Sequence, residues 1–236
     1  MKRLVSFGLI GFVLLLTTRS FGAPVPELVA QLQDKDNDVR RAAARQLGEA
    51  GADAREAIPA LIRALKDEDA YVRRFAALAL GDIRSDPKTV VPALIAVLNK
   101  PGERKEVQEA AATALGKLGG GGAEALGKVV VDGDREVMVR RRAIEALGAI
   151  GPPAHAALPE LTEVLNGKVK TGKKADPNDA ARDLRLEAID ALAHIANSKD
   201  TATIKALEDL AADKKAKGPL KGAAGKAARE IMRREG

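Results

Sequence analysis

The chain has 236 residues, 46% of them hydrophobic and 2% aromatic, and it contains no cysteine. The lack of cysteine excludes disulfides and the attachment of a bacterial lipid through a thiol. The net charge of +6 comes from 39 basic and 33 acidic residues. Such a mixed balance is typical of a soluble surface and argues against a nucleic-acid footprint.

Residues 1–22 have the features of a secretory signal peptide. The start is basic, residues 4–16 are apolar, and Ser20 and Gly22 place small side chains at a cleavage site. We expect cleavage after Gly22 and export to the periplasm or out of the cell. The alternative is an uncleaved membrane anchor. The mature chain has a net charge of +3, and we expect it neither to be embedded in a membrane nor to bind nucleic acid.

The rest of the chain repeats one pattern six times, which predicts a single repeat domain over residues 23–236. Each copy begins with a short apolar helix, often behind a proline, and continues with a second helix after a turn. In the second copy, Val72, Ala76, Leu80 and Ile83 form one apolar stripe on that second helix. Such regular self-similarity predicts an all-α, right-handed α-solenoid of about six helix pairs. The pairs are expected to start near residues 26, 58, 91, 123, 158 and 204, with a flexible insertion at residues 167–183.

A glycine follows the stripe leucine that corresponds to Leu80 in the first four copies, at Gly48, Gly81, Gly116 and Gly148. Glycine inside a helix costs roughly 1 kcal/mol relative to alanine. Its recurrence at one position therefore predicts that a neighbouring helix approaches the backbone closely there.

The core pattern Val-Arg-x-x-Ala-Ala-x-Ala-Leu-Gly resembles the short HEAT-like repeats first grouped with phycobilisome bilin lyases. The resemblance covers about residues 26–234 and implies a solenoid with a concave surface formed by the second helices. It implies a function less specifically. We expect an exported, non-enzymatic binding or scaffold module that holds another protein on that surface.

The alternative function is that of a HEAT-like enzyme, either a bilin lyase or a metal-dependent hydroxylase. The hydroxylase that this architecture resembles holds two irons through repeated His-Glu pairs. Here His155 precedes Ala156 and His194 precedes Ile195, so no such pair exists. The sequence therefore predicts no catalytic residue, no cofactor and no metal ligand.

A first row of arginines directly follows the stripe Val or Leu, and we expect it to be structural. An acidic residue four positions earlier can cap the second helix and pair with the arginine one turn later. The resemblance implies in addition that this arginine connects neighbouring repeats. In the third copy both members change together, to Arg104 and Gln108. The residues assigned to this structural set are Arg40, Arg73, Arg140, Arg185, Asp36, Asp69 and Glu136.

A second row of arginines lies one position further along, and nothing in the repeat pattern requires it. One interpretation is a solvated face with local ion pairs, each of small value. The other, which we adopt as the prediction, is a basic patch on the concave surface that binds an acidic protein segment. The residues of this predicted partner-binding set are Arg41, Arg45, Arg74, Arg141 and Arg142. Tyr71 and Phe75 lie four residues apart, which suits a small contact point, although the alternative that Phe75 belongs to the core is favoured.

Overall fold

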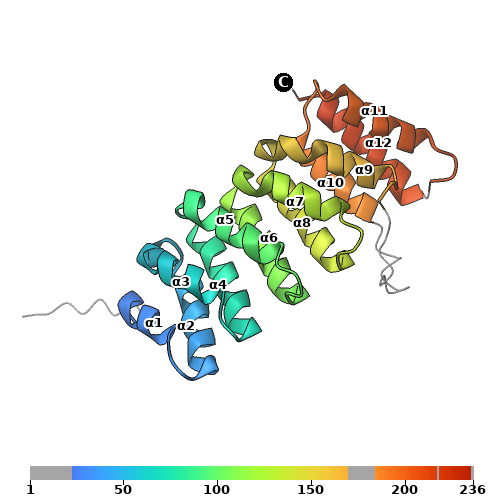
Figure 1. The fold of residues 1–236 in the computed structure, drawn as a ribbon. Coiled ribbons are helices and arrows are strands. Elements are labelled where there is room, and N and C mark those ends of the chain that lie inside the picture. Colours follow the sequence, from blue (N-terminus) through green and yellow to red (C-terminus); the bar gives the residue numbers. More distant parts are fainter. Residues whose placement is uncertain (1–22, 170–183, 217, 235–236) are drawn as a thin grey trace, which may run out of the picture.

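A computed structural model describes residues 23–169, 184–216 and 218–234 of the chain. The predicted signal segment and residues 170–183 of the predicted insertion lie outside these described residues. The described part is helical throughout and forms six consecutive helix pairs (Figure 1), which confirms the predicted all-α solenoid. The pairs are α1 Val25–Gln31 with α2 Asn37–Ala50, α3 Ile58–Ala64 with α4 Ala70–Ile83, α5 Pro87–Leu98 with α6 Lys105–Leu118, α7 Ala123–Val131 with α8 Val137–Ile150, α9 Leu158–Leu165 with α10 Leu184–Ile195, and α11 Thr201–Ala212 with α12 Gly218–Met232.

Three short 3-10 segments, Gly51–Ala57, Gly120–Gly122 and Pro152–Ala157, lead into the first helices α3, α7 and α9. Proline occupies the first turn of the first helices of the first, second, third and fifth pairs. There its missing N–H has no intrahelical partner to lose. The third pair begins earlier than expected, at Pro87, so Pro92 lies inside α5 rather than at its start.

Aspartates cap two of the second helices, as the sequence predicts. The Asp36 carboxylate accepts a hydrogen bond from the Asp38 N–H at 2.9 Å at the start of α2. Asp69 accepts from the Val72 N–H at the same distance at the start of α4. Glu136 stands at the corresponding position of α8 but makes no capping hydrogen bond, so the cap predicted for it is wrong. Its side chain has one more methylene than aspartate, and glutamate is not among the residues preferred at this position.

The recurring glycines lie where successive second helices touch. A Cβ atom built on Gly81 would stand 2.7 Å from the Cα of Ala114, and one on Gly116 would stand 2.9 Å from the Cβ of Ala146. Real Cβ atoms do not approach other atoms so closely. Gly48 and Gly148 make the same kind of contact, with Ala79 and Ala191. The predicted close backbone approach is confirmed.

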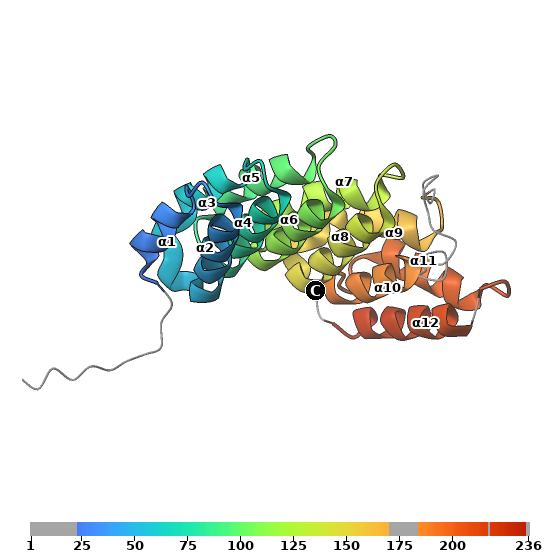
Figure 2. The same cartoon turned by 90° about the horizontal axis from the view of Figure 1, so that it is seen from below.

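The first and second helices of the pairs form two layers. Figure 2 shows the first helices along the outer side of a curved array and the second helices along its inner side. We call the inner side, formed by α2, α4, α6, α8, α10 and α12, the concave surface. The buried core lies between the two layers and is made of leucine, isoleucine, valine and alanine. The glycine–alanine contacts bring the inner helices close together and thus favour this curvature.

Candidate binding surface

Three open grooves lie on the concave surface, each between consecutive second helices. The α2–α4 groove has a volume of about 430 Å³ and is lined mainly by Ala44, Gly48, Phe75, Leu78 and Ala79. The α6–α8 groove, of about 370 Å³, contains Thr113, Lys117 and Ala149. The α8–α10 groove, of about 660 Å³, is lined by Leu186, three carboxylates and His194. The concave surface therefore offers a row of shallow, separately lined depressions.

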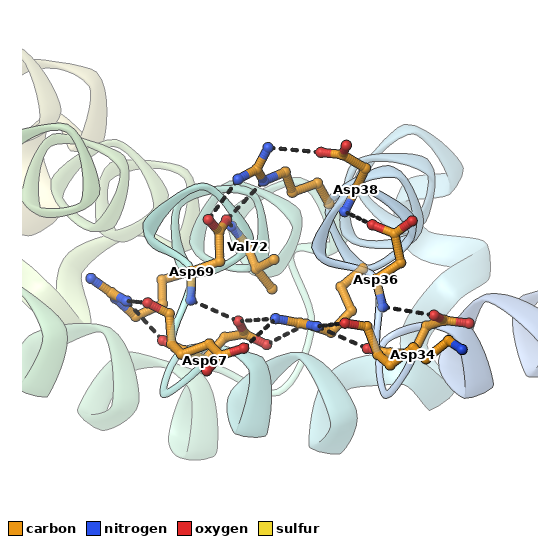
Figure 3. Close-up of polar contacts among 11 residues, drawn as sticks. Asp34, Asp36, Asp38, Asp67, Asp69 and Val72 are labelled. Carbon is orange, nitrogen blue, oxygen red and sulfur yellow. Dashed lines mark hydrogen bonds and ion pairs between the residues drawn. The ribbon is translucent and has the colours of Figure 1, made fainter.

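The first arginine row lies at the edge of the array, at the turns between first and second helices. Arg40 donates two hydrogen bonds to the Asp67 carboxylate of the next repeat, both at 2.9 Å. Arg73 does the same with Glu103, at 2.9 and 2.5 Å. Figure 3 shows the aspartates of the first two turns, with Asp67 and Asp69 of the second facing Asp34, Asp36 and Asp38 of the first.

Each arginine of the first row also donates to a carbonyl near the end of the first helix in its own repeat. Arg40 donates to the Asp34 carbonyl at 2.8 Å, and Arg73 to the Asp67 carbonyl at 2.7 Å. Arg140 donates to the Val130 carbonyl and Arg185 to the Leu165 carbonyl, both at 2.9 Å. These contacts hold the two helices of one pair together, and Arg40 and Arg73 also connect that pair to the next.

The predicted pairing of Arg40 and Arg73 with the carboxylate four residues earlier is wrong. Arg40 pairs with Asp67 rather than with Asp36, and Arg73 pairs with Glu103 rather than with Asp69. The aspartates are turned toward backbone N–H groups as caps, and the guanidinium groups extend to the next turn instead. The implied connection between repeats is present in these two cases.

The third repeat makes this connection in the opposite direction. Gln108 replaces the arginine and donates to the Leu98 carbonyl of its own repeat at 3.2 Å. Arg135, in the turn of the fourth repeat, reaches back to the same carbonyl and to the Asn99 side chain at 3.0 Å. Arg135 cannot be recognised from the repeat pattern, because it lies outside the repeating frame of the second helices.

The second arginine row is largely engaged as well. Arg41 donates to both oxygens of Asp69 in the next repeat, at 2.8 and 2.6 Å, and to Asp38 at 2.8 Å. Arg141 donates to Glu187 of the next repeat at 2.5 Å. The expectation that nothing in the repeat requires this row is therefore wrong for Arg41 and Arg141.

The other three arginines of the predicted partner-binding set differ from one another. Arg142 donates to Glu145 at 2.6 Å, and Arg45 lies 3.7 Å from Glu49, both within one helix. Arg74 makes no hydrogen bond or ion pair with any described residue, and its guanidinium carbon lies 5.8 Å from the centroid of the Phe75 ring. Arg74 is thus the member of the set that remains available to a carboxylate from outside.

Ion pairing shifts the pKa of several carboxyl groups. The hydrogen bonds from Arg41 hold the pKa of Asp69 far below its usual range. Burial by itself would raise the pKa of Glu103, but hydrogen bonds from Arg73, the Arg104 N–H and Lys100 outweigh burial and lower it to about 2. Burial raises the pKa of Glu109, against the opposing effect of Arg142 and Arg74. The first two carboxylates are therefore stabilised in their charged form by the folded repeats.

The two histidines lie in different contacts. His155 Nε2 is 2.7 Å from a carboxylate oxygen of Asp200, which connects the fifth repeat to the turn before α11. His194 Nδ1 lies 2.8 Å from the Asp190 carbonyl within α10. Among the described residues, no group of histidine and acidic side chains has the arrangement that would hold a metal ion. In the same part of the chain, no helix is both long and apolar enough to cross a membrane.

Known proteins share the fold of this chain. No curated protein matches the chain. A designed armadillo repeat protein, solved in complex with the peptide (KR)4, shares 21% identity and a TM-score of 0.59, over 89% of this chain and 100% of that one. Kap121p shares 17% identity and a TM-score of 0.63, over 90% of this chain and 23% of that one. At these identities the likeness concerns the fold alone.

The complex of CpcE and CpcF of phycocyanin lyase from Nostoc sp. PCC7120 is 29% identical, over 87% of each chain, with a TM-score of 0.49. At this score the likeness carries no functional argument. The family model for HEAT repeats matches residues 25–105 and 91–175, which is more than half of the chain. The chain belongs to the HEAT-repeat family.

Proposed function

We propose that this protein is an exported, non-enzymatic binding module that holds a segment of another protein along its concave surface. The observation that carries the proposal is the row of three grooves between successive second helices. Several grooves along one surface suit an extended chain, which can place side chains in more than one of them. The designed armadillo repeat protein, a similar solenoid, is solved with a peptide bound.

The proposed partner is a protein segment with acidic character rather than a nucleic acid. Fewer arginines support an acidic partner than the sequence predicts. Four of the five predicted partner-binding arginines lie next to carboxylates of the chain itself, namely Arg41, Arg45, Arg141 and Arg142. Arg74 is the arginine that supports an acidic partner. The net charge of the mature chain is small, which favours recognition of individual side chains over long-range attraction to a polyanion.

Cross-linking from single positions tests the binding surface. The chain has no cysteine, so a single introduced thiol can carry a benzophenone. Thr113→Cys places it in the α6–α8 groove, and Ala202→Cys places it on the exposed outer helix α11 as the matched control. Peptides selected from a random display library against the purified protein are expected to cross-link at the first position and not at the second. Equal cross-linking at both positions, or none at the first, would overturn the proposed binding surface.

The proposed export rests on the basic start, the apolar residues 4–16 and the Ser20/Gly22 pair. N-terminal sequencing of the protein from its native cell is expected to begin at Ala23. An intact Met1 in a cytosolic fraction would contradict export.

A further inference from the structure

The exposed face of α4 differs in chemistry from the rest of the concave surface. Tyr71 and Phe75 are the aromatic residues of the described part of the chain, and both lie on this helix. Tyr71 is open to solvent, with 48% of the residue exposed. Phe75 and Leu78 are half-buried and line the α2–α4 groove. Together, Tyr71, Arg74, Phe75 and Leu78 form what we call the α4 patch.

The neighbouring second helices do not repeat this apolar character. Arg45 of α2 and Thr113 of α6 take the place that Leu78 has in α4, and Ala42 and Ala110 take that of Phe75. Phe75 and Leu78 pack against the core with part of their surface, but α2 and α6 have alanine or polar residues at the matching positions. Large rings that stay partly exposed on a surface are frequent anchors of protein interfaces.

The charge beside the α4 patch indicates what kind of partner fits it. Arg74 lies next to Phe75 and has no carboxylate within ion-pair distance among the described residues. Glu109 on the neighbouring helix α6 interacts with Arg74 and Arg142 through its charge, and it forms no ion pair with either arginine among the described residues. A guanidinium is planar and can donate two parallel hydrogen bonds to one carboxylate. Arg74 can therefore bind a carboxylate of a partner protein.

The remaining charges around the groove are already balanced. Arg41 is held by Asp69 and stacks over the Tyr71 ring at 4.9 Å. Arg45 lies beside Glu49, and Asp82 accepts from Lys117 of α6. A carboxylate that approaches Arg74 therefore meets a guanidinium group that no carboxylate of the described residues binds directly.

We infer that the α4 patch is the anchor subsite of the proposed binding surface. It takes one apolar side chain of an extended protein segment into the α2–α4 groove and a neighbouring carboxylate of that segment onto Arg74. This inference rests on the proposed function and names the chemistry that the partner must carry at one point.

Four matched nonapeptides on a Gly-Ser background test the inference, with Leu-Glu, Leu-Lys, Ser-Glu or Ser-Lys at the centre. Each is titrated into the isotope-labelled protein and followed by amide and methyl resonances, which detect millimolar binding. We expect the Leu-Glu peptide to bind at least tenfold more tightly than the other three. Its shifts should centre on Tyr71, Phe75, Leu78 and Gly48.

Variants assign the two halves of the recognition. Arg74→Gln is expected to abolish the preference for Leu-Glu over Leu-Lys, whereas Arg63→Gln, an exposed arginine on the outer helix α3, leaves it unchanged. Leu78→Arg introduces the residue type that the first repeat has at this position, Arg45, and it should weaken the Leu-Glu peptide at least fivefold.

The outcome that overturns the inference differs from the one that overturns the proposed function. Shifts centred on the α8–α10 groove, or equal binding of the Leu-Glu and Leu-Lys peptides, would refute the α4 patch as anchor and leave the binding surface standing. Failure of the Leu-Glu peptide to give a saturable shift at millimolar concentration refutes the α4 patch as well. The proposed binding surface itself is refuted by the cross-linking experiment, through equal cross-linking at Thr113→Cys and Ala202→Cys or none at Thr113→Cys.

Discussion

Arg73 and Arg74 are neighbours in the chain, but they point into two regions of the molecule that use arginine differently. Arg73 lies at the turn edge, where it bridges to Glu103 and to the Asp67 carbonyl. Arg74 lies on the concave surface beside Phe75, and within the described part of the chain no carboxylate lies within ion-pair distance of it. The turn edge is thus committed to joining repeats, whereas part of the concave surface is left open.

The same two regions are less distinct in the first repeat. Arg40 bridges to Asp67 at the turn edge, and Arg41, its neighbour, bridges to Asp69. Repeat position alone therefore does not decide whether a concave arginine is available. What decides it is whether the next repeat supplies a carboxylate, as Asp69 does for Arg41.

The largest effect on stability is expected at the turn edge. Arg40→Ala leaves the Asp67 carboxylate, whose side chain is 12% exposed, without its bidentate partner. Breaking such a largely buried pair should lower the free energy of unfolding by about 3 kcal/mol, as measured by urea denaturation. Arg63→Ala, on the exposed outer face of α3, is the control and should change it by less than about 0.5 kcal/mol. An Arg40→Ala effect as small as the control would show that the turn edge does not hold the repeats together.

Close contact between second helices gives the next largest effect. Gly81→Ala places a methyl group 2.7 Å from the Ala114 Cα, a backbone atom that cannot move without shifting its helix. We expect a loss of about 2 kcal/mol in the free energy of unfolding. Gly222→Ala is the matched control, because Gly222 lies inside α12 with nothing within 4 Å of the added atom. It should stabilise the protein by about 1 kcal/mol. The opposite signs distinguish helix contact from helix propensity.

Acid should weaken the turn edge selectively. The pKa of Glu103 is lowered to about 2 in the folded protein, so its contribution to stability is full above the unfolded value near 4.5 and is lost as the pH falls toward 2. Glu103→Gln should therefore be less stable than the wild type at pH 7, and most of this deficit should disappear between pH 5 and pH 2, because the wild type then loses the charge of Glu103. A deficit that stays constant over this range in thermal unfolding would contradict the assigned pairing.

The reversed connection between the third and fourth repeats should give the smallest of these effects. Arg135→Ala removes hydrogen bonds to the Leu98 carbonyl and the Asn99 side chain, and Gln108 still donates to that carbonyl. We expect a loss of about 1 kcal/mol. The double variant with Gln108→Ala should lose more than the sum of the two single variants, since the carbonyl then has neither donor. Strict additivity would show that the two side chains do not share this role.

The sequence predicts the solenoid well because its signals are local. Stripes at helical spacing and glycines at one recurring position report packing that every repeat makes in the same way. The partners of the arginines could not be predicted from local spacing. Asp67 lies 27 residues from Arg40, in the loop between α3 and α4. A rule that pairs residues three or four positions apart cannot predict such a contact.

The free state of Arg74 could not be predicted either, because Arg41, Arg74 and Arg141 look alike in the aligned repeats. Their difference arises from the following repeat. Asp69 accepts a hydrogen bond from Arg41, and Glu187 accepts one from Arg141. Glu109 interacts with Arg74 only through its charge. Arg135 was missed for a related reason, since it takes over a repeat connection from outside the repeating frame.

The most direct test compares Arg73→Ala with Arg74→Ala on the same preparations, by urea unfolding and by titration with the Leu-Glu peptide. Arg73→Ala is expected to lower the free energy of unfolding by about 3 kcal/mol and leave peptide affinity within twofold of the wild type. Arg74→Ala is expected to leave stability within about 0.5 kcal/mol and to weaken the peptide about tenfold. If Arg74→Ala instead destabilises the protein and Arg73→Ala weakens the peptide, the division between the turn edge and the concave surface is wrong.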